Sequence, residues 1–181
     1  MPDLDVYLQQ ADETLAAWAQ AGDIKAFGQL SRRYQAILLR FVRRNFPVIV
    51  DHEDVVQEAF LKAFENLARY RAGRLVRTWL FTITFRVAVS HIRRRSSGLK
   101  LLARFVGHAT SAAPPDCNTH RDELRKVWDD AAKILTPTQF RAIWLLFAEE
   151  MDRSEIAVIL GKTRTTTKLI LYRAQCKLRT Y

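Results

Sequence analysis

The sequence predicts an all-α protein built from two small helical domains joined by a flexible linker. Apolar residues recur at helical spacing along most of the chain, and strand-like alternation is absent from its first half. The segment 107–118, which is rich in Ala, Pro and small polar residues, interrupts this pattern, because two consecutive prolines do not fit inside a helix. The predicted organisation is a four-helix bundle over residues 1–97, a linker over 98–120 and a second helical domain over 121–181.

Glycine and proline divide the first half of the chain into helices. A first helix is expected over residues 5–21, after which Gly22 and Asp23 supply a helix stop and an N-cap. A second helix is expected from Ile24 to Asn45, because Pro47 follows it. The candidate core residues of these two helices are Leu8, Leu15, Trp18, Phe27, Leu30, Tyr34, Ile37, Leu38 and Phe41.

The next helix, with Asp51 as its expected N-cap, has two different faces. One face is an apolar stripe that predicts a core contact, and it contains Val56, Phe60, Ala63, Phe64 and Leu67. The other face is acidic with one leucine, and its residues are Asp54, Gln57, Glu58, Leu61 and Glu65. We expect this second face to be exposed, to have no role inside the chain, and to bind a protein.

The helix around Trp79 has the opposite charge. Between Asn66 and Pro115 the chain has ten Lys and Arg residues and no Asp or Glu, which equals the formal net charge of +10 of the whole chain. Five residues fall close to one line on this helix: Trp79, Thr82, Arg86, Ser90 and Arg93. A solvated basic face would also produce a charge run, but the exclusion of acids favours a polyanionic partner. Trp79 is equally well explained as a core residue.

Helix-start patterns divide the second domain, whose first helix is expected from Arg121 to about Leu135. Thr136 and Asp152 each begin a capping-box pattern. The apolar face of the helix after Thr136 contains Phe140, Ile143, Trp144 and Phe147. The remaining pattern predicts a helix-turn-helix: a short helix is followed by Gly161, a cap at Thr163 and a basic last helix to about Arg179. The inner face of the last helix is expected to be Thr167, Leu171, Ala174 and Leu178.

Several other classes of protein do not fit. The first residues lack a signal-peptide pattern, and no apolar run reaches the length of a membrane span. Cys117 and Cys176 are isolated, which predicts a reducing cytoplasm, and the C-x-x-H spacing of Cys117 and His120 lacks the second pair of a zinc site. The chain has no nucleophile–base pair, Gly-rich phosphate loop or ligand cluster, so we expect no enzyme activity, metal or cofactor.

Two separate segments resemble extracytoplasmic-function (ECF) sigma factors of bacterial RNA polymerase. Three stretches are similar to region two of that family: DHEDVVQEAF from Asp51, RTWL from Arg77 and IRRR from Ile92. The similarity to region four lies in LTP from Leu135, SEIA from Ser154, LG from Leu160, and the basic residues Lys168, Arg173 and Arg179. The resemblance implies binding to core polymerase, through the clamp helices of the beta-prime subunit and the flap of the beta subunit, and recognition and opening of promoter DNA.

The resemblance also implies roles for residues. Polymerase would bind Asp54, Gln57, Glu58, Leu61 and Glu65. The minus-ten element would contact Arg77, Trp79, Arg86, Ser90, Arg93 and Arg94. The minus-thirty-five element would contact Arg164, Thr165, Thr166, Lys168, Leu169, Tyr172 and Arg173.

The chain also departs from the family pattern. Arg86 and Ser90 stand where Asn and Asp are usual, and Glu150 stands where glycine is common. In the last helix Gly, Val, Ser and Arg are usual at the positions of Thr165, Thr167, Leu169 and Ile170. These departures leave the promoter sequence open. Two alternatives also stay open: a helix-turn-helix regulator that acts without polymerase, and a sigma-like mimic that only binds an anti-sigma protein. An anti-sigma factor is also an expected partner.

Overall fold

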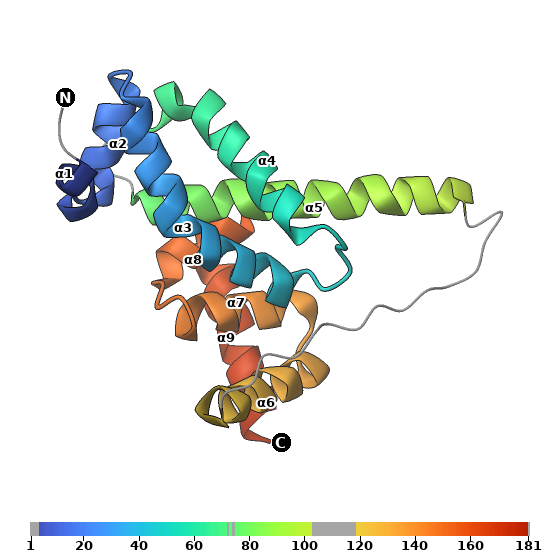
Figure 1. Cartoon of the computed structure of the whole chain (residues 1–181). Helices are drawn as coiled ribbons and strands as arrows, with labels where there is room; N and C mark the ends of the chain where they lie inside the picture. Colours follow the sequence, from blue (N-terminus) through green and yellow to red (C-terminus); the bar gives the residue numbers. More distant parts are fainter. Residues whose placement is uncertain (1–3, 72, 74, 103–118, 181) are drawn as a thin grey trace. The chain divides into compact units, whose positions relative to one another are not determined.

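The computed structural model describes residues 4–71, 73, 75–102 and 119–180, and every regular element within them is helical (Figure 1). Contacts between Cα atoms divide the chain into two compact units. The first unit runs to Arg94, and the second contains most of the chain from Arg95 onward. Within the described part of the chain, no helix is both long enough and apolar enough to cross a membrane.

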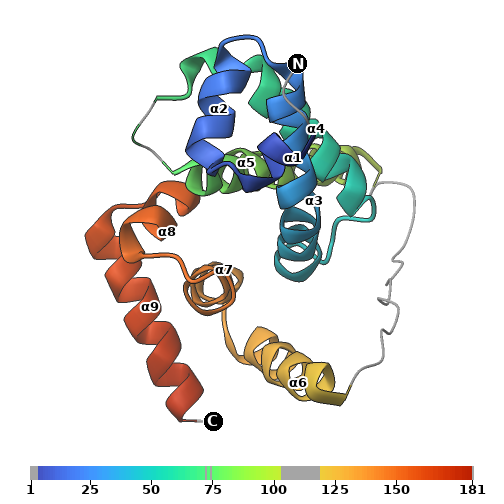
Figure 2. The same ribbon diagram turned by 60° about the vertical axis from the view of Figure 1, so that its left-hand side comes forward.

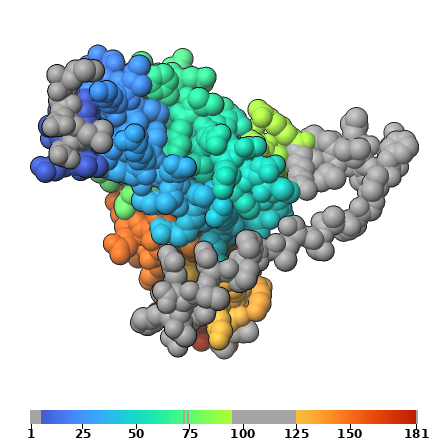
Figure 3. Space-filling view, in the orientation of Figure 1, coloured from blue at the N-terminus to red at the C-terminus, as the bar shows by residue number. Residues whose placement is uncertain are grey.

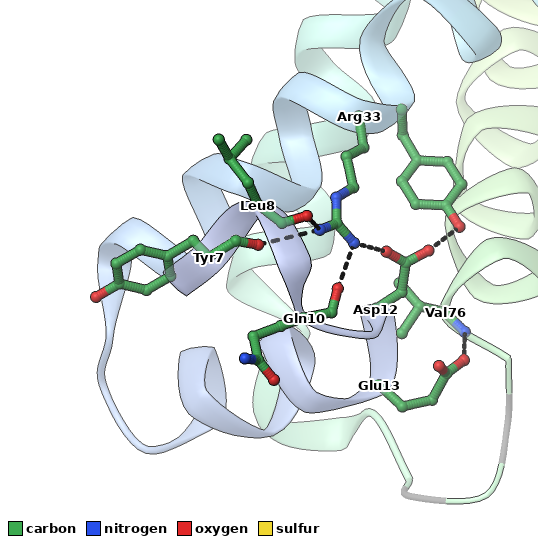
Figure 4. A network of polar contacts seen from close by, with 8 residues as sticks. Tyr7, Leu8, Gln10, Asp12, Glu13, Arg33 and Val76 are labelled. Atoms are coloured by element: carbon green, nitrogen blue, oxygen red, sulfur yellow. Dashed lines mark hydrogen bonds and ion pairs between the residues drawn. The ribbon is translucent and has the colours of Figure 1, made fainter. Parts of the chain in front are cut away.

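The N-terminal segment forms two helices, α1 (Leu4–Gln9) and α2 (Asp12–Gln20), so the prediction of one helix over residues 5–21 is wrong. Arg33 explains the break (Figure 4). Its guanidinium donates to the carbonyl oxygens of Tyr7, Leu8 and Gln10 at 2.7–3.0 Å and to the carboxylate of Asp12 at 2.6 Å. These bonds satisfy carbonyls that a continuous helix would have used itself. Consequently Leu8 is 55% exposed rather than in the core, whereas Leu15 is buried.

Helix α3 (Ile24–Asn45) has the predicted bounds. Asp23 caps it, because its carboxylate accepts hydrogen bonds from the backbone N–H groups of Lys25 and Ala26. The predicted apolar band forms the core of the first unit, except that Ile37 is half-buried. The buried members are Phe27, Leu30, Tyr34, Leu38 and Phe41.

Helix α4 (His52–Glu65) lies beside α3. Asp51 occupies the N-cap position, as predicted, but its side chain makes no capping hydrogen bond there. Val56 and Ala63 of the predicted apolar stripe are buried, whereas Phe64 is 47% exposed. Phe64 lies near the end of α4 and contacts Phe27 edge-on, with ring centroids 5.2 Å apart, so only part of its ring is covered.

After a short 3-10 helix, η1 (Leu67–Arg69), the chain turns at Gly73, whose φ of 94° suits glycine, and enters α5 (Val76–Leu102). Helices α1–α4 gather around the N-terminal part of α5 (Figure 1). Phe81 anchors α5 against Phe41, with centroids 5.0 Å apart. The helix continues five residues into the predicted linker, 98–120, because no proline stops it there. Cys117 and residues 103–118 lie outside the described residues.

The second unit contains α6 (Thr119–Ile134), α7 (Pro137–Phe147), most of α8 (Arg153–Leu160) and α9 (Arg164–Arg179). Figure 2 views α7 nearly end-on and shows the short turn from α8 into α9. Helix α7 packs against α6 and α9, and an aromatic cluster of Trp128, Phe140 and Trp144 joins α6 to α7. Three members of the predicted apolar face, Phe140, Ile143 and Trp144, are buried, whereas Phe147 is 60% exposed because α7 ends there.

The predicted starts of α7, α8 and α9 are confirmed, whereas α6 begins at Thr119, two residues before the predicted Arg121. Thr136 and Gln139 form a reciprocal capping box at α7, and Asp152 and Glu155 form another before α8. Thr163 caps α9 by accepting a hydrogen bond from the backbone N–H of Thr166 at 3.1 Å. These caps determine where the two helices of the helix-turn-helix begin, and Gly161, with φ of 62°, provides the turn between them.

Candidate functional site

Five residues of α4 form one side of the helix, which we call the α4 surface: Asp54, Gln57, Glu58, Leu61 and Glu65. They share a side because their spacing follows the helical repeat. Asp54, Gln57 and Glu65 are exposed, and Leu61 is 65% exposed. The prediction of an exposed acidic face with one leucine is therefore confirmed for these four residues.

Glu58 differs from its neighbours because both of its carboxylate oxygens have partners inside the chain. Oε1 accepts from Lys62 Nζ at 2.5 Å, and Oε2 lies 2.6 Å from Nε2 of His91 on α5. The hydrogen bonds from Lys62 and His91 hold the pKa of Glu58 below its usual value. The prediction that Glu58 has no role inside the chain is wrong, and the local sequence could not show it, because His91 lies 33 residues further along the chain.

A groove of about 560 Å³ lies beside the α4 surface. Its walls come from α3 and α4, which lie side by side in Figure 3. Its lining is mixed: the apolar side chains include Phe27, Leu39, Phe60, Leu61 and Phe64, and the polar ones include Gln57. Sequence reasoning missed this groove because it assigned Phe60 and Phe64 to the core. Their helical spacing places them on the side facing α3, but only the packing of α3 determines how completely they are covered.

A second surface lies on α5, and we call Trp79, Arg86, Ser90, Arg93 and Arg94 the α5 surface. The three arginines are exposed, whereas Trp79 and Ser90 are half-buried. The indole of Trp79 contacts the ring of Tyr70, with centroids 5.1 Å apart, so it is held against the start of the loop between η1 and α5. Helix α5 contains no Asp or Glu, so its exposed charges are all positive.

Two residues of the same helix do not join the α5 surface. Thr82 is buried, and its hydroxyl donates to the carbonyl oxygen of Thr78 at 2.7 Å. Arg77 lies two residues before Trp79, on roughly the opposite side of the helix. Burial raises the pKa of Tyr34, and the nearby positive charge of Arg77 acts in the opposite direction. Arg77 is half-buried and lies close enough to Tyr34 for its charge to act on that side chain.

A third surface lies on α9, and its members are exposed and mostly polar or basic. We call it the α9 surface: Arg164, Thr165, Thr166, Lys168, Leu169, Tyr172 and Arg173. It lies opposite the predicted inner face, of which Thr167, Leu171 and Ala174 are buried and Leu178 is half-buried. Leu169 is 45% exposed, as its position predicts, and Ile170 is half-buried at the flank. The unpaired N–H groups at the start of α9 add partial positive charge to this surface.

Comparisons with known proteins place the chain in one family. Residues 30–98 match the family Sigma-70 region 2. The chain is 31% identical to the ECF RNA polymerase sigma-E factor of Haemophilus influenzae, over 92% of this chain and 93% of that protein. It is 34% identical to the RNA polymerase sigma-H factor of Pseudomonas aeruginosa, over 92% of this chain and 91% of that protein.

A solved structure also matches over nearly the whole chain. The structure of CnrH in complex with the cytosolic domain of CnrY is 29% identical, covers 94% of this chain and 96% of that one, and has a TM-score of 0.63. The family match includes the α4 and α5 surfaces, and the relatives extend the likeness to the helix-turn-helix. The chain therefore belongs to the ECF sigma factors of the sigma-70 family, whose function is to direct RNA polymerase in transcription initiation.

Proposed function

We propose that this sigma factor binds the beta-prime clamp helices of core RNA polymerase through its α4 surface. The observation that carries the proposal is an exposed leucine, Leu61, surrounded by exposed acidic and polar side chains on one side of one helix. An apolar side chain that becomes covered supplies affinity, and the acids orient a basic partner. The adjacent groove between α3 and α4 would extend the same contact.

The α5 surface is proposed to bind and open the minus-ten element. Strand opening needs a surface that favours single-stranded DNA, with cations along the backbone and aromatic or polar groups near unstacked bases. Arg86, Arg93 and Arg94 are exposed and supply the cations. Trp79 is held against Tyr70, so its ring would meet DNA in a defined position. Arg77 lies on another side of α5, near Tyr34, and would act by holding this helix in place.

The α9 surface is proposed to read the minus-thirty-five element from the major groove. A helix-turn-helix places the exposed N-terminal part of its second helix against base edges. Lys168, Leu169 and Tyr172 are exposed on that helix, opposite its buried face. The roles divide along the chain into a polymerase and minus-ten domain over residues 1–97, a linker over 98–120 and a minus-thirty-five and beta-flap domain over 121–181.

An anti-sigma protein is a further proposed partner, because the solved CnrH structure contains the cytosolic domain of a second protein, CnrY. We expect a protein of this kind to compete with core polymerase for this chain. The measurement is transcription in vitro with a candidate partner added before or after core polymerase. Equal transcription in both orders would argue against competition. The protein itself is proposed to act without a cofactor and in the cytoplasm, where RNA polymerase works.

The main experiment combines the full chain with core polymerase and genomic DNA, and sequences the 5′ ends of the transcripts. We expect new start sites that share two upstream elements. Replacing Trp79 and Arg86 together by alanine should reduce permanganate-reactive thymines at these sites more than it reduces polymerase binding. Arg32→Ala is the matched control, because Arg32 is exposed on α3 outside the three surfaces. Start sites identical to those of core polymerase alone would contradict the proposal.

A further inference from the structure

Glu58 is the residue of the α4 surface that also joins α4 to α5. Its Oε2 lies 2.6 Å from Nε2 of His91, and the two side chains are 27% and 29% exposed. An ionised carboxylate only accepts hydrogen bonds, so Nε2–H of His91 is the donor. Glu58 thus lies where the helix proposed to face polymerase meets the helix proposed to face the promoter.

The carboxylate of Glu58 is held in place but can still accept further hydrogen bonds. Lys62 occupies one oxygen and His91 the other, while a carboxylate has about four lone-pair sites. The remaining sites and the partial exposure allow a further donor from a partner protein to bind. A free glutamate would lose rotamer freedom on binding, but Glu58 has already lost it in the unbound protein.

Lys62 and His91 restrain Glu58 in different ways. Lys62 is four residues away on the same helix, so its contact moves with α4 and does not hold α4 against another element. His91 comes from α5, so its bond holds the Glu58 carboxylate relative to α5 as well. The neighbours of His91 in the chain include Ser90 and Arg93, both members of the α5 surface.

We propose that His91 is a positioning residue for polymerase binding: it holds the Glu58 carboxylate in the orientation that core polymerase contacts. This inference rests on the proposed role of the α4 surface. Because the bond joins the two helices, a displacement of α5 that moves His91 away from Glu58 lowers the affinity of the protein for polymerase. By thermodynamic linkage, polymerase bound at Glu58 stabilises the same position of α5.

The test is a double-mutant cycle on the dissociation constant for core polymerase, measured with the full chain. His91→Phe keeps a ring of similar shape and removes the donor, and Glu58→Met removes the acceptor. We expect His91→Phe to weaken binding about three- to tenfold, the size of one hydrogen bond of ordinary net strength. In the Glu58→Met background the same change should have no further effect, because the two residues act as a pair.

Two further variants separate positioning from packing. His91→Gln restores an N–H donor without the ring and should recover most of the affinity. Lys62→Met is the matched control, because it removes the other partner of Glu58 but leaves the bond between the helices, and its effect should be smaller. Thermal unfolding of each variant shows whether loss of affinity follows loss of stability. If the phenylalanine variant does not fold, His91→Met supplies the same loss of a donor with a flexible apolar side chain.

The outcomes distinguish this inference from the proposed function. If Glu58→Met leaves the affinity unchanged, Glu58 does not contact polymerase and its place in the α4 surface is wrong. If Glu58→Met weakens binding but His91→Phe does not, only the positioning role is overturned. Equal weakening by His91→Phe in both backgrounds, or no recovery with His91→Gln, would mean that His91 acts by packing rather than through Glu58.

Discussion

Leu61 provides the sharpest measure of how the α4 surface contributes to polymerase binding. Its side chain is 65% exposed in the free protein, so most of its apolar area is available to a partner. Burying a whole leucine side chain is worth about 1.5–3 kcal/mol, and alanine retains only the first carbon. If polymerase covers the exposed part, Leu61→Ala should cost about 1 kcal/mol of binding free energy, or roughly fivefold in the dissociation constant.

The assay is competition for core polymerase between labelled wild-type protein and each unlabelled variant. Ile24→Ala is the matched control: Ile24 is 73% exposed at the start of α3, outside the α4 surface, and should leave the affinity unchanged. Because Leu61 is mainly exposed and alanine favours helix, the free energy of unfolding should change by less than about 1 kcal/mol. An affinity within twofold of wild type would refute burial of Leu61 in the complex.

Four other substitutions test the second unit. Glu150 has a φ of 51°, a left-handed conformation that costs a non-glycine residue energy, so Glu150→Gly should stabilise by up to about 1 kcal/mol in calorimetry. The buried hydroxyl of Thr167 has no hydrogen-bond partner among the described residues, so Thr167→Val should raise stability by about 1 kcal/mol and leave DNA binding unchanged; lower stability would mean that the hydroxyl is satisfied. Leu169→Ser should change base preference at one minus-thirty-five position, and an unchanged binding-site selection would show that Leu169 reads no base. Arg173→Ala should weaken binding across sequences and reduce its salt slope by about one, if Arg173 contacts a phosphate.

Local interactions explain which predictions from sequence were confirmed. Helix α3 has the predicted bounds because Asp23 caps it within three residues and Pro47 follows its end. The starts of α7, α8 and α9 depend on caps at Thr136, Asp152 and Thr163, each acting within three residues. Such contacts are already determined by neighbouring side chains and can be read without knowledge of the fold.

Several predictions that failed depend on contacts between distant parts of the chain. The break between α1 and α2 requires the guanidinium of Arg33, which lies 21 residues beyond Asp12. Phe64 follows the apolar stripe of α4, yet the position of α3 leaves it half covered. Periodicity indicates which side of a helix is apolar, but it does not indicate how far the neighbouring helix covers each residue.

The sequence by itself determined the helical class, most helix boundaries, the acidic and basic faces and the resemblance to sigma factors, because these depend on spacing, capping and residue type. Only the tertiary structure decided that Glu58 is bonded to His91, that the guanidinium of Arg33 binds the carbonyl oxygens at the break between α1 and α2, and that a groove opens between α3 and α4. The physical reason is that a carboxylate, a guanidinium or a phenyl ring is exposed or partnered according to which helices pack together. That packing follows from the burial of apolar area across the whole unit rather than from any one segment.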